Sequence, residues 1–462
     1  MSSPLSVVIL AAGFGTRMKS QTTKVLHRAG GLPLVEHVVR TALTLAPPER
    51  IVTVVGHQAE RVAAAVAPYR VHTALQEEPR GTGHALRCAR EAAPVDGHLV
   101  VLYGDVPLLS EATLARLVMQ QVSSSAAATV LTAELADPAA YGRIIRGEDG
   151  GVEAIVEYKA ASDAQRGIRE INSGIYCFDA ALLWQHIDSI TTNNPAGEFY
   201  LTDMVEILRA HGHRVDGQIM ADSSELLGIN TKVELAEVDR LFRLRKATQL
   251  MLDGVTIERP ETVAIDNDAL IGPDSVIEPN TRILGKTTIG SNARIGTGSI
   301  VTNSVIADSV IVEPYCVIDN TVIGAGSHIG PFARLRLKNQ VGNHVHIGNF
   351  VELKNTAMAD GAKANHLAYL GDSVIGSNTN IGAGVITCNY DGNKKHPTVI
   401  GDRVFVGSNS TLVAPITVEP DSYVGAGSVI TEQVPGGALA LGRGRQVIKE
   451  GWVERKKQKQ GE

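Results

Sequence analysis

A short stretch near the start of the chain combines two glycines with two cations. Residues 10–18 read LAAGFGTRM, including Gly13, Gly15 and Arg17, and Lys24 follows six residues later. Glycine lets a backbone bend tightly and approach a ligand closely, and successive backbone N–H groups form a nest for phosphate oxygens. Arg17 and Lys24 add positive charge beside that nest. The stretch therefore predicts a turn that binds a triphosphate.

Two commoner glycine motifs are excluded here. A dinucleotide-binding fingerprint needs a third glycine where this chain has Met18, and no G-x-x-x-x-G-K-[ST] run of a Walker loop occurs. An ordinary strand-to-helix turn with two solvated basic side chains stays open as the alternative, because short glycine-rich turns are weak signals on their own.

A carboxylate follows a second apolar run. Residues 99–102 (LVVL) predict a buried strand, and Tyr103, Gly104 and Asp105 come directly after it. Mg²⁺ binds one or two carboxylates together with phosphate oxygens, so Asp105 is a candidate metal ligand if it faces the phosphate-binding turn. The alternative is that Asp105 caps the turn that begins at Val106.

A histidine in the second half of the chain could act as a base. Residues 363–372 and 387–396 interrupt a repeating pattern, and the first of these segments contains His366. Histidine titrates near neutral pH, which suits a general base. A packed or surface role is the alternative, and it is the commoner one for the 14 histidines of the chain.

The apolar runs in the first half of the chain are expected to form one sheet. Residues 7–10, 51–55 and 99–102 are short apolar runs separated by helix-compatible sequence. Such alternation predicts a parallel α/β sheet, in which ligands bind beyond the carboxyl ends of the strands. The glycine-rich turn and Asp105 both fall at such ends.

From residue 265 onward, an aliphatic residue recurs every six positions. Three runs keep this spacing, from Ile265 to Val301, from Val305 to Leu353 and from Ile400 to Ile430. A hexapeptide repeat predicts a parallel β-helix, in which every one of these side chains points into a shared core and the coils stack. The breaks in phase mark loops, and loops carry function.

One helix is predicted between the two halves. Residues 233–253 carry a single apolar stripe at helical spacing, and Gly254 follows as a stop signal. We therefore divide the chain into residues 1–232, a helical linker over 233–253, and a β-helix over 254–462.

The composition is that of a globular protein with several domains. The chain has 462 residues, of which 44% are apolar, and its net charge of -6 argues against a dedicated nucleic-acid binder. The first apolar run is too short for a signal peptide or a membrane span, so we expect a cytoplasmic protein without stable membrane insertion. Four scattered cysteines without a C-x-x-C pair predict buried free thiols.

Motifs in both halves resemble one family. Residues 10–18, with Lys24 and the Val-Leu-His that follows it, resemble the signature of sugar-1-phosphate nucleotidyltransferases. They resemble in particular the uridylyltransferase half of the bifunctional bacterial N-acetylglucosamine-1-phosphate uridylyltransferase / glucosamine-1-phosphate N-acetyltransferases. Residues 363–372 (KANHLAYLGD) are similar to a string in the acetyltransferase half of that family. The resemblance spans nearly the whole chain.

The resemblance implies a fold and a pair of reactions. It implies a Rossmann-like nucleotidyltransferase (pyrophosphorylase) domain over 1–232, and a left-handed parallel β-helix over 254–462 that assembles as a homotrimer. The second domain would acetylate glucosamine-1-phosphate with acetyl-CoA. The first would then transfer UMP from UTP with Mg²⁺, releasing pyrophosphate and giving UDP-N-acetylglucosamine for cell-wall precursors.

The resemblance also assigns site residues. The implied catalytic residues are Arg17, Lys24 and His366, and the implied metal ligands are Asp105 and Asn230. The implied nucleotide and sugar contacts are Leu10, Ala11, Ala12, Gly13, Lys24, Gln76, Gly81, Thr82, Tyr103, Gly104, Asp105, Gly142, Glu157, Asn172 and Asn230. Glucosamine-1-phosphate would be held by Arg336, Lys354, Tyr369 and Asn380. Acetyl-CoA would be held by Ala383, Asn389, Tyr390, Ser408, Ala426 and Arg443.

The chain departs from the family pattern at three places. Thr23 stands where a proline is usual, Asn365 where a glycine is common, and Leu337-Lys338 where the family has Pro-Gly.

Three other functions stay open. One is a single-activity sugar nucleotidyltransferase whose β-helix is regulatory or trimerising, and another is a non-enzymatic trimeric scaffold. The third is a β-helical carbonic anhydrase, with zinc held by His328, His344 and His346. Release of free thiol from acetyl-CoA separates the first two from the bifunctional enzyme.

Overall fold

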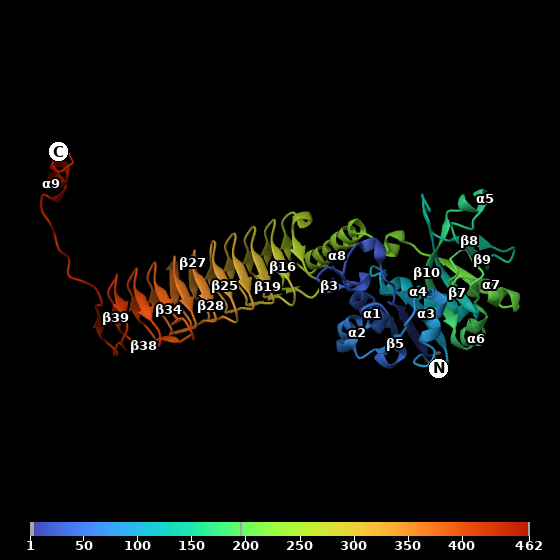
Figure 1. The fold of residues 1–462 in the computed structure, drawn as a ribbon, viewed down its shortest axis with the longest axis horizontal. Helices are drawn as coiled ribbons and strands as arrows, with labels where there is room; N and C mark the ends of the chain where they lie inside the picture. Colours follow the sequence, from blue (N-terminus) through green and yellow to red (C-terminus); the bar gives the residue numbers. More distant parts are fainter. Residues whose placement is uncertain (1–3, 195, 461–462) are drawn as a thin grey trace. The chain divides into compact units, whose positions relative to one another are not determined.

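The computed structural model describes residues 4–194 and 196–460, which fall into two compact units that divide between Phe242 and Arg243 (Figure 1). The N-terminal unit is a sheet with helices on its faces, and the C-terminal unit is a stack of short strands.

One mixed sheet forms the centre of the N-terminal unit. Its strands are β1 (Leu5–Leu10), β4 (Ile51–Val55), β5 (His72–Leu75), β6 (His98–Tyr103), β7 (Ala128–Glu134), β8 (Arg143–Arg146), β9 (Val152–Val156), β10 (Glu170–Asp179) and β11 (Val215–Ile219). The main order is β11-β7-β10-β6-β1-β4-β5. The predicted parallel pairing is confirmed for β6-β1-β4-β5. β10 instead lies antiparallel to β6 and β7, because the chain returns beside β7 through the β8–β9 hairpin rather than a long crossover helix.

Both faces of the sheet are buried. Alternate residues of β1 enter different cores, Val8 and Leu10 on one face and Val7 and Ile9 on the other. Burial on both faces explains why the central strands are uninterrupted apolar runs. The helices of this unit are α1 (Leu34–Leu45), α2 (Ala59–Val66), α3 (Thr82–Cys88), α4 (Glu111–Ser124), α5 (Asp163–Arg166), α6 (Ala180–His186) and α7 (Asp203–Ala210), and β2 (Arg28–Ala29) pairs with β3 (Leu32–Pro33).

The C-terminal unit is a left-handed parallel β-helix whose coils contribute strands to three sheets. The first sheet contains β12 (Thr256–Ile257), β15 (Val276–Ile277), β18 (Arg294–Ile295), β21 (Ile311–Val312), β24 (His328–Ile329), β27 (His346–Asn349), β30 (Lys363–His366), β33 (Asn380–Ile381), β36 (Phe405–Val406), β39 (Tyr423–Val424) and β41 (Leu439–Ala440). The second contains β13 (Ala264–Ile265), β16 (Arg282–Leu284), β19 (Ile300–Thr302), β22 (Val317–Asp319), β25 (Arg334–Arg336), β28 (Glu352–Lys354), β31 (Tyr369–Gly371), β34 (Ile386–Cys388), β37 (Thr411–Val413) and β40 (Val429–Ile430). The third contains β14 (Leu270–Ile271), β17 (Thr288–Ile289), β20 (Val305–Ile306), β23 (Val322–Ile323), β26 (Gln340–Val341), β29 (Ala357–Met358), β32 (Ser373–Ile375), β35 (Thr398–Ile400) and β38 (Ile416–Val418).

The predicted inward face is right for most coils and wrong for three positions. Val305, Ile311 and Val317 are 47%, 40% and 43% exposed, and the residue after each of them is buried instead. The steps from Val301 to Ile306 and from Ile318 to Ile323 are five residues long, so the phase shifts twice. Each misplaced residue is the first of two adjacent aliphatics, which left its direction ambiguous in the sequence.

The helix between the halves is α8 (Lys232–Leu252), which covers all but one residue of the predicted linker. The two compact units divide inside it, between Phe242 and Arg243. The functional boundaries at 232 and 254 stay a prediction. A further helix, α9 (Trp452–Gln458), lies near the end of the chain.

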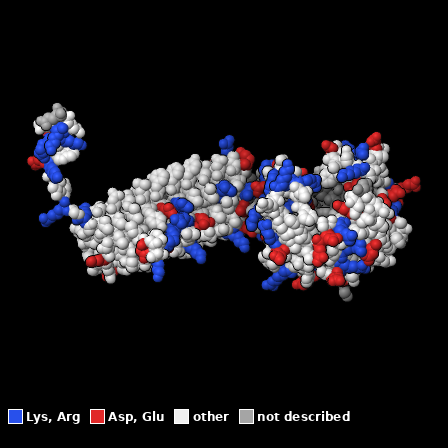
Figure 2. Space-filling view, in the orientation of Figure 1, with Lys and Arg blue, Asp and Glu red and all other residues white. Residues whose placement is uncertain are grey.

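The surfaces of the two units differ in charge. The face of the β-helix seen in Figure 2 carries few charged side chains, whereas the N-terminal unit shows both signs over its surface. No helix in the described part of the chain has both the length and the apolar character needed to cross a membrane. All four cysteines are free; Cys177 and Cys316 are buried as predicted, and Cys88 and Cys388 are partly exposed.

Candidate active sites

The first site is a cleft of about 360 Å³ at the carboxyl ends of β1 and β6. Leu10 and Tyr103 end these two parallel strands as register partners, which brings the glycine-rich turn next to Asp105. The lining residues are Leu10, Ala11, Ala12, Gly13, Arg17, Lys24, Val25, Gln76, Pro79, Gly81, Thr82, Ala85, Tyr103, Asp105, Glu198 and Asn230. Residues predicted from four separate segments therefore meet in one place. Gly104 lies beneath the turn, and its N–H donates to the carbonyl oxygen of Leu10 over 2.9 Å.

The two glycines of the turn have different roles. Gly15 adopts φ 61°, and a Cβ there would lie 2.6 Å from Cβ of Lys24, so only glycine fits between the turn and the lysine. A Cβ on Gly13 would meet nothing within 4 Å. Gly13 therefore leaves open space on the cleft side, where the backbone can face a ligand.

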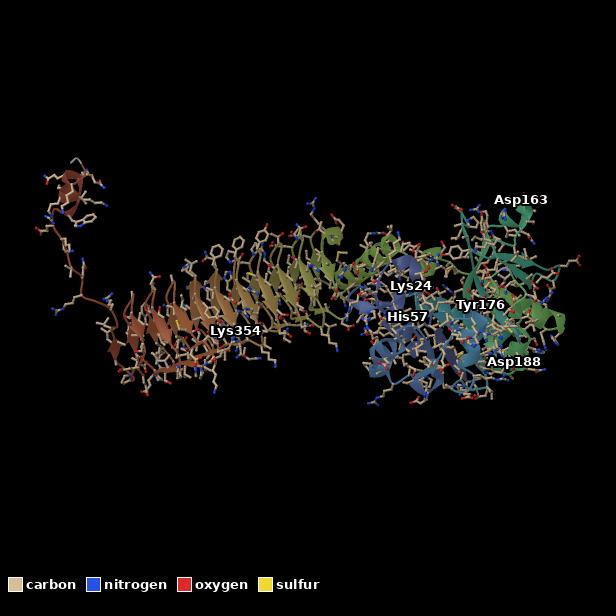
Figure 3. The ribbon with its side chains drawn as sticks, in the orientation of Figure 1. Lys24, His57, Asp163, Tyr176, Asp188 and Lys354 are labelled. Atoms are coloured by element: carbon tan, nitrogen blue, oxygen red, sulfur yellow. The ribbon has the colours of Figure 1, made fainter. Side chains whose placement is uncertain are left out.

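Two cations and two oxygen-bearing side chains converge in this cleft. Lys24 forms an ion pair with Asp105, and both side chains are mostly buried. The side-chain oxygen of Asn230 accepts from Arg17 Nη2 over 2.7 Å and from Lys24 Nζ over 3.3 Å. Asn230 is more than 200 residues away from both cations in sequence. Lys24 is labelled in Figure 3.

The donor set of the cleft fits Mg²⁺. Asp105 supplies a carboxylate and Asn230 an amide oxygen, both hard donors, and Mg²⁺ fills its remaining positions with phosphate oxygens and water. Across residues 4–194 and 196–460, no three His, Cys, Asp or Glu side chains are grouped as a metal site. The zinc alternative at His328, His344 and His346 therefore has no three-ligand group among these described residues.

Three of the implied nucleotide contacts, Gln76, Gly81 and Thr82, line the cleft from another loop. Gln76 is buried, and its Nε2 contacts the Gly81 carbonyl oxygen at 3.3 Å and His84 Nδ1 at 3.0 Å. Gly81 adopts φ 105°, and a Cβ there would lie 2.5 Å from the carbonyl oxygen of Phe199. Oγ1 of Thr82 accepts a hydrogen bond from the N–H of Leu201 over 3.1 Å.

A second cavity, of about 410 Å³, belongs to the same unit. Glu157 lines it, and Gly142 and Asn172 lie beside Glu157: a Cβ on Gly142 would be 3.6 Å from Glu157 Oε1 and 3.7 Å from Asn172 Cβ. Asn172 is buried, and its amide is engaged with the hydroxyl of Tyr176 and the N–H of Gly174. The structure thus brings these three implied nucleotide and sugar contacts together, with Glu157 on the lining of the cavity.

Several residues of this cavity were missed in the sequence. Tyr200, Thr202, Asp203 and Glu206 line it together with Tyr158, and Glu198 lines the nucleotide cleft. Burial, with Glu206 and Glu157 nearby, raises the pKa of Asp203 to about 6, and burial raises the pKa of Glu157. The signal that could have found most of them is the string EFYLTD at residues 198–203, which ends on the first residue of α7.

The second site follows one corner of the β-helix, between the first and second sheets. His366 ends β30 at this corner. Backbone hydrogen bonds between successive coils join the same corner position from coil to coil. The stacked residues are Asn349, His366, Ala383, Ser408 and Ala426, and Nη1 of Arg443 donates to the carbonyl oxygen of Ala426 over 2.8 Å. Three of the six residues predicted for acetyl-CoA therefore continue the column that contains His366, and a fourth, Arg443, contacts the last residue of that column.

Cations gather on the outward face of the second sheet. Lys354, labelled in Figure 3, is buried and pairs with Asp372 at 2.7 Å, and Asn389 also donates to Asp372. Burial acts to raise the pKa of Asp372, but hydrogen bonds from Lys354, Asn355 and Asn389 outweigh it and hold that pKa below its ordinary value. Arg336 pairs with Glu352 at 2.6 Å. Lys395 also lies close enough to Lys354 to affect the pKa of Lys354. Lys395 was not among the site residues predicted from the sequence.

One chain does not bring all predicted residues of this site together. Arg336, Lys354 and Tyr369 share the second sheet, whereas Asn380 is on the first sheet between Lys363 and Phe405. Tyr390 lies in the exposed loop that follows β34. His366, at the corner, separates the two faces.

The three departures from the family pattern have different consequences. Thr23 adopts φ -57° and ψ 146°, angles that proline also adopts, so the turn keeps its shape. Leu337 and Lys338 adopt φ 63° and 61°, which proline cannot reach, so this turn differs from a Pro-Gly turn. Asn365 occupies a position where the coils before and after it have glycine, and its buried Oδ1 has no hydrogen-bond partner.

Comparison with known proteins supports a two-part organisation. Residues 7–171 match the MobA-like NTP transferase domain. Residues 259–345 match the GMPPB C-terminal domain, and residues 397–432 match the hexapeptide repeat of succinyl-transferase.

Similar proteins extend over the full length. The chain is 55% identical to the bifunctional protein GlmU of Solibacter usitatus, over 99% of this chain and 98% of that protein. It is 48% identical to the protein of the same name from Koribacter versatilis and 44% identical to that from Clostridioides difficile, each over 98% of both chains.

Fold and sites together define a class, a nucleotidyltransferase domain joined to a hexapeptide-repeat acyltransferase domain. Within that class, the identities over nearly the whole length show that the chain belongs to the GlmU family of bifunctional proteins.

Proposed function

We propose that the two halves carry out consecutive transfers. The C-terminal half acetylates the amine of glucosamine-1-phosphate, and the N-terminal half joins the product to UMP, which gives UDP-N-acetylglucosamine. The observation that carries the proposal is the convergence of Arg17, Lys24, Asp105 and Asn230 in one cleft beside an open glycine turn.

In the uridylyl transfer, a phosphate oxygen of N-acetylglucosamine-1-phosphate attacks the α-phosphorus of UTP, and pyrophosphate leaves. The backbone at Gly13 would face the phosphates, while Arg17 and Lys24 neutralise the charge on UTP and on the leaving pyrophosphate. Bound Mg²⁺, held by Asp105 and Asn230, would supply further neutralisation of phosphate charge. Phosphate binding would draw Lys24 away from Asp105, which frees that carboxylate for the metal.

The cavity lined by Glu157 would take the sugar. Carboxylates accept hydrogen bonds from sugar hydroxyl groups, and Tyr158 and Tyr200 supply aromatic surface beside them. The acidic side chains also disfavour a phosphate in this cavity, so the phosphate of the sugar would face Arg17 and Lys24.

In the acetyl transfer, His366 would accept a proton from the amine of glucosamine-1-phosphate. The nitrogen then bonds to the thioester carbonyl carbon of acetyl-CoA, and the carbon–sulfur bond breaks to release the CoA thiol. Arg336 and Lys354 would hold the sugar phosphate. The corner below His366, at Ala383, Ser408 and Ala426, would hold acetyl-CoA, and Asn389, Tyr390 and Arg443 would complete that site.

Assembly and location belong to the same proposal. A homotrimer would let neighbouring copies complete a site whose residues lie on two faces of one chain, and the sparsely charged face of the β-helix suits such packing. Acetyl-CoA and UTP are substrates of the cytoplasm, where we place the protein.

A two-stage assay tests both halves. Protein, glucosamine-1-phosphate and acetyl-CoA are mixed, thiol release is followed, and UTP with Mg²⁺ is then added while pyrophosphate is measured. We expect both signals in the unaltered protein. His366→Ala should abolish thiol release, and it should form pyrophosphate only when N-acetylglucosamine-1-phosphate is supplied. Arg17→Ala should keep thiol release and lower pyrophosphate formation by about 100-fold or more.

Matched variants make the result specific. Arg240→Ala, on an exposed part of α8 where the side chain pairs with Glu237, should leave both signals unchanged. Absence of thiol release, with pyrophosphate still formed from supplied N-acetylglucosamine-1-phosphate, would favour a single-activity nucleotidyltransferase with a regulatory or trimerising β-helix. Near-normal turnover in Arg17→Ala would remove that residue from the mechanism.

A further inference from the structure

The imidazole of His366 has one side-chain hydrogen bond in the structure. Its Nδ1 lies 2.8 Å from Oδ1 of Asn349, which ends β27 on the preceding coil. The two residues are register partners in the first sheet, and a backbone hydrogen bond from Leu367 to Asn349 holds the coils together beside them.

This contact determines the tautomer of the histidine. An amide oxygen has no proton to donate, so the contact is a hydrogen bond only when Nδ1 carries the proton. Nε2 then has the lone pair. A base needs that lone pair to accept a proton, and one hydrogen bond to the other ring nitrogen is the usual way to keep it in place.

Among the stacked corner residues from Pro314 to Ala383, asparagine occurs only on the coil before His366. At the same corner position, the two coils before Asn349 have Pro314 and Pro331, and the coil after His366 has Ala383. None of those three side chains offers a hydrogen bond to an imidazole. An asparagine therefore stands at the one adjacent position from which a side chain contacts Nδ1.

We propose that Asn349 is a positioning residue for acetyl transfer, which holds His366 in the tautomer that exposes the Nε2 lone pair to the amine of the substrate. This inference rests on the proposed function of His366 as the base. Asn349 acts through the imidazole and touches neither the sugar nor acetyl-CoA in this role.

Other charged and titratable groups also face this corner. His346 and Lys363 lie on the same outward face of the first sheet, and His328 stacks on His346 with ring centroids 4.9 Å apart. His328 in turn bonds Glu313 at 2.8 Å. These groups are unchanged in variants of Asn349, so a difference between such variants reports the contact with Nδ1.

Three variants of Asn349 test the proposal in the full-length protein. Asn349→Ala removes the acceptor and should lower kcat for thiol release about 10- to 100-fold, with KM for both substrates within twofold. Asn349→Asp keeps an acceptor that cannot donate, so it should retain more activity than the alanine variant. Its negative charge also favours the imidazolium, so the acidic limb of its pH–rate profile should move to higher pH. Asn349→Leu keeps the volume without the acceptor and should behave as alanine does.

Controls separate the positioning role of Asn349 from the proposed role of His366 as the base. Asn343→Ala, an exposed turn asparagine before β27 that bonds Asp360, should leave kcat unchanged. In protein labelled with ¹⁵N-histidine, the His366 signal, identified by its loss in His366→Ala, should show a protonated Nδ1 that is lost in Asn349→Ala. A kcat near normal in Asn349→Ala, while His366→Ala is inactive, would overturn the positioning role and leave the base intact. Full activity in His366→Ala would instead overturn the proposed base itself.

Discussion

Asp203 and Glu157 are carboxylates whose pKa values lie above their ordinary range, and both line the cavity proposed for the sugar. Burial is the first cause at both residues, and at Asp203 the nearby Glu206 and Glu157 add to it. Such perturbation is frequent at functional sites. It also means that the charged form of Asp203 opposes folding.

The pH dependence of stability follows from Asp203. Its pKa is about 6 in the folded chain and close to 3.8 in the unfolded chain. Between those values the folded state binds more protons than the unfolded state, so the contribution of Asp203 to stability falls as pH rises from about 4 to 6. Asp203→Asn should therefore raise the free energy of unfolding at pH 7.5 by about 1 kcal/mol, after allowance for solvent screening.

Calorimetry of the full chain at two pH values measures this effect. The variant should unfold at a higher temperature than the unaltered protein at pH 7.5, and at the same temperature at pH 4. Glu148→Gln, which removes a carboxylate outside that cavity, serves as the control. An equal stabilisation at both pH values would show that titration of Asp203 is not the cause.

At the scale of elements, two turns test what the departures from the family pattern do. Thr23 already has the backbone angles of proline, and its N–H makes only a long hydrogen bond of 3.4 Å to Gln58 Oε1, so Thr23→Pro should change stability by less than about 1 kcal/mol and keep uridylyl transfer. Leu337 has φ 63°, so Leu337→Pro should destabilise the β-helix by about 3 kcal/mol or more. Thermal unfolding and the two activity assays measure both variants.

A second substitution in the Leu337–Lys338 turn tests the same argument in the opposite direction. Lys338→Gly relieves a side chain held at φ 61°, so it should stabilise the same turn by about 1 kcal/mol. If Leu337→Pro were as stable as the unaltered chain, the turn would adopt the Pro-Gly shape in solution.

The β-helix also shows how stacking aligns distant residues. His366 and Ala426 are 60 positions apart, yet they occupy the same corner because each coil repeats the backbone of the one before it. Stacked coils lie about 4.8 Å apart, so the corner forms a continuous edge. An elongated ligand such as acetyl-CoA matches that geometry.

At the scale of the whole molecule, two compact units with separate cores predict two separate unfolding events. Ile283 is fully buried in the β-helix and far in sequence from His366. Ile283→Ala should cost about 2–5 kcal/mol through a cavity in that core. It should lower the unfolding temperature of the β-helix and leave that of the N-terminal unit and the rate of uridylyl transfer unchanged.

Calorimetry with both assays decides this point. Ile283→Val removes less volume at the same place, so it should lower the free energy of unfolding of the β-helix by only about 1 kcal/mol. If Ile283→Ala lowered both transitions together, the two units would unfold as one cooperative body.

Much of this protein was determined by local sequence. The glycine turn, Asp105 after a buried strand and the six-residue period each follow from a few neighbouring residues, because backbone conformation and side-chain periodicity are local properties. Family resemblance extended this to Asn230 and to the acetyl-CoA residues. These predictions needed no knowledge of how distant segments meet.

Only the tertiary structure decided the rest. Pairing between distant segments placed Asn230 against Arg17 and Lys24, turned β10 antiparallel, and put Asn380 on a different face from Lys354. The outward direction of Val305 was also beyond the sequence, since Val305 and Ile306 satisfy the period equally well and only the five-residue step from Val301 selects Ile306 for the core. The contact between Asn349 and His366 belongs here too, because residues 17 positions apart become neighbours only when one coil stacks on the next.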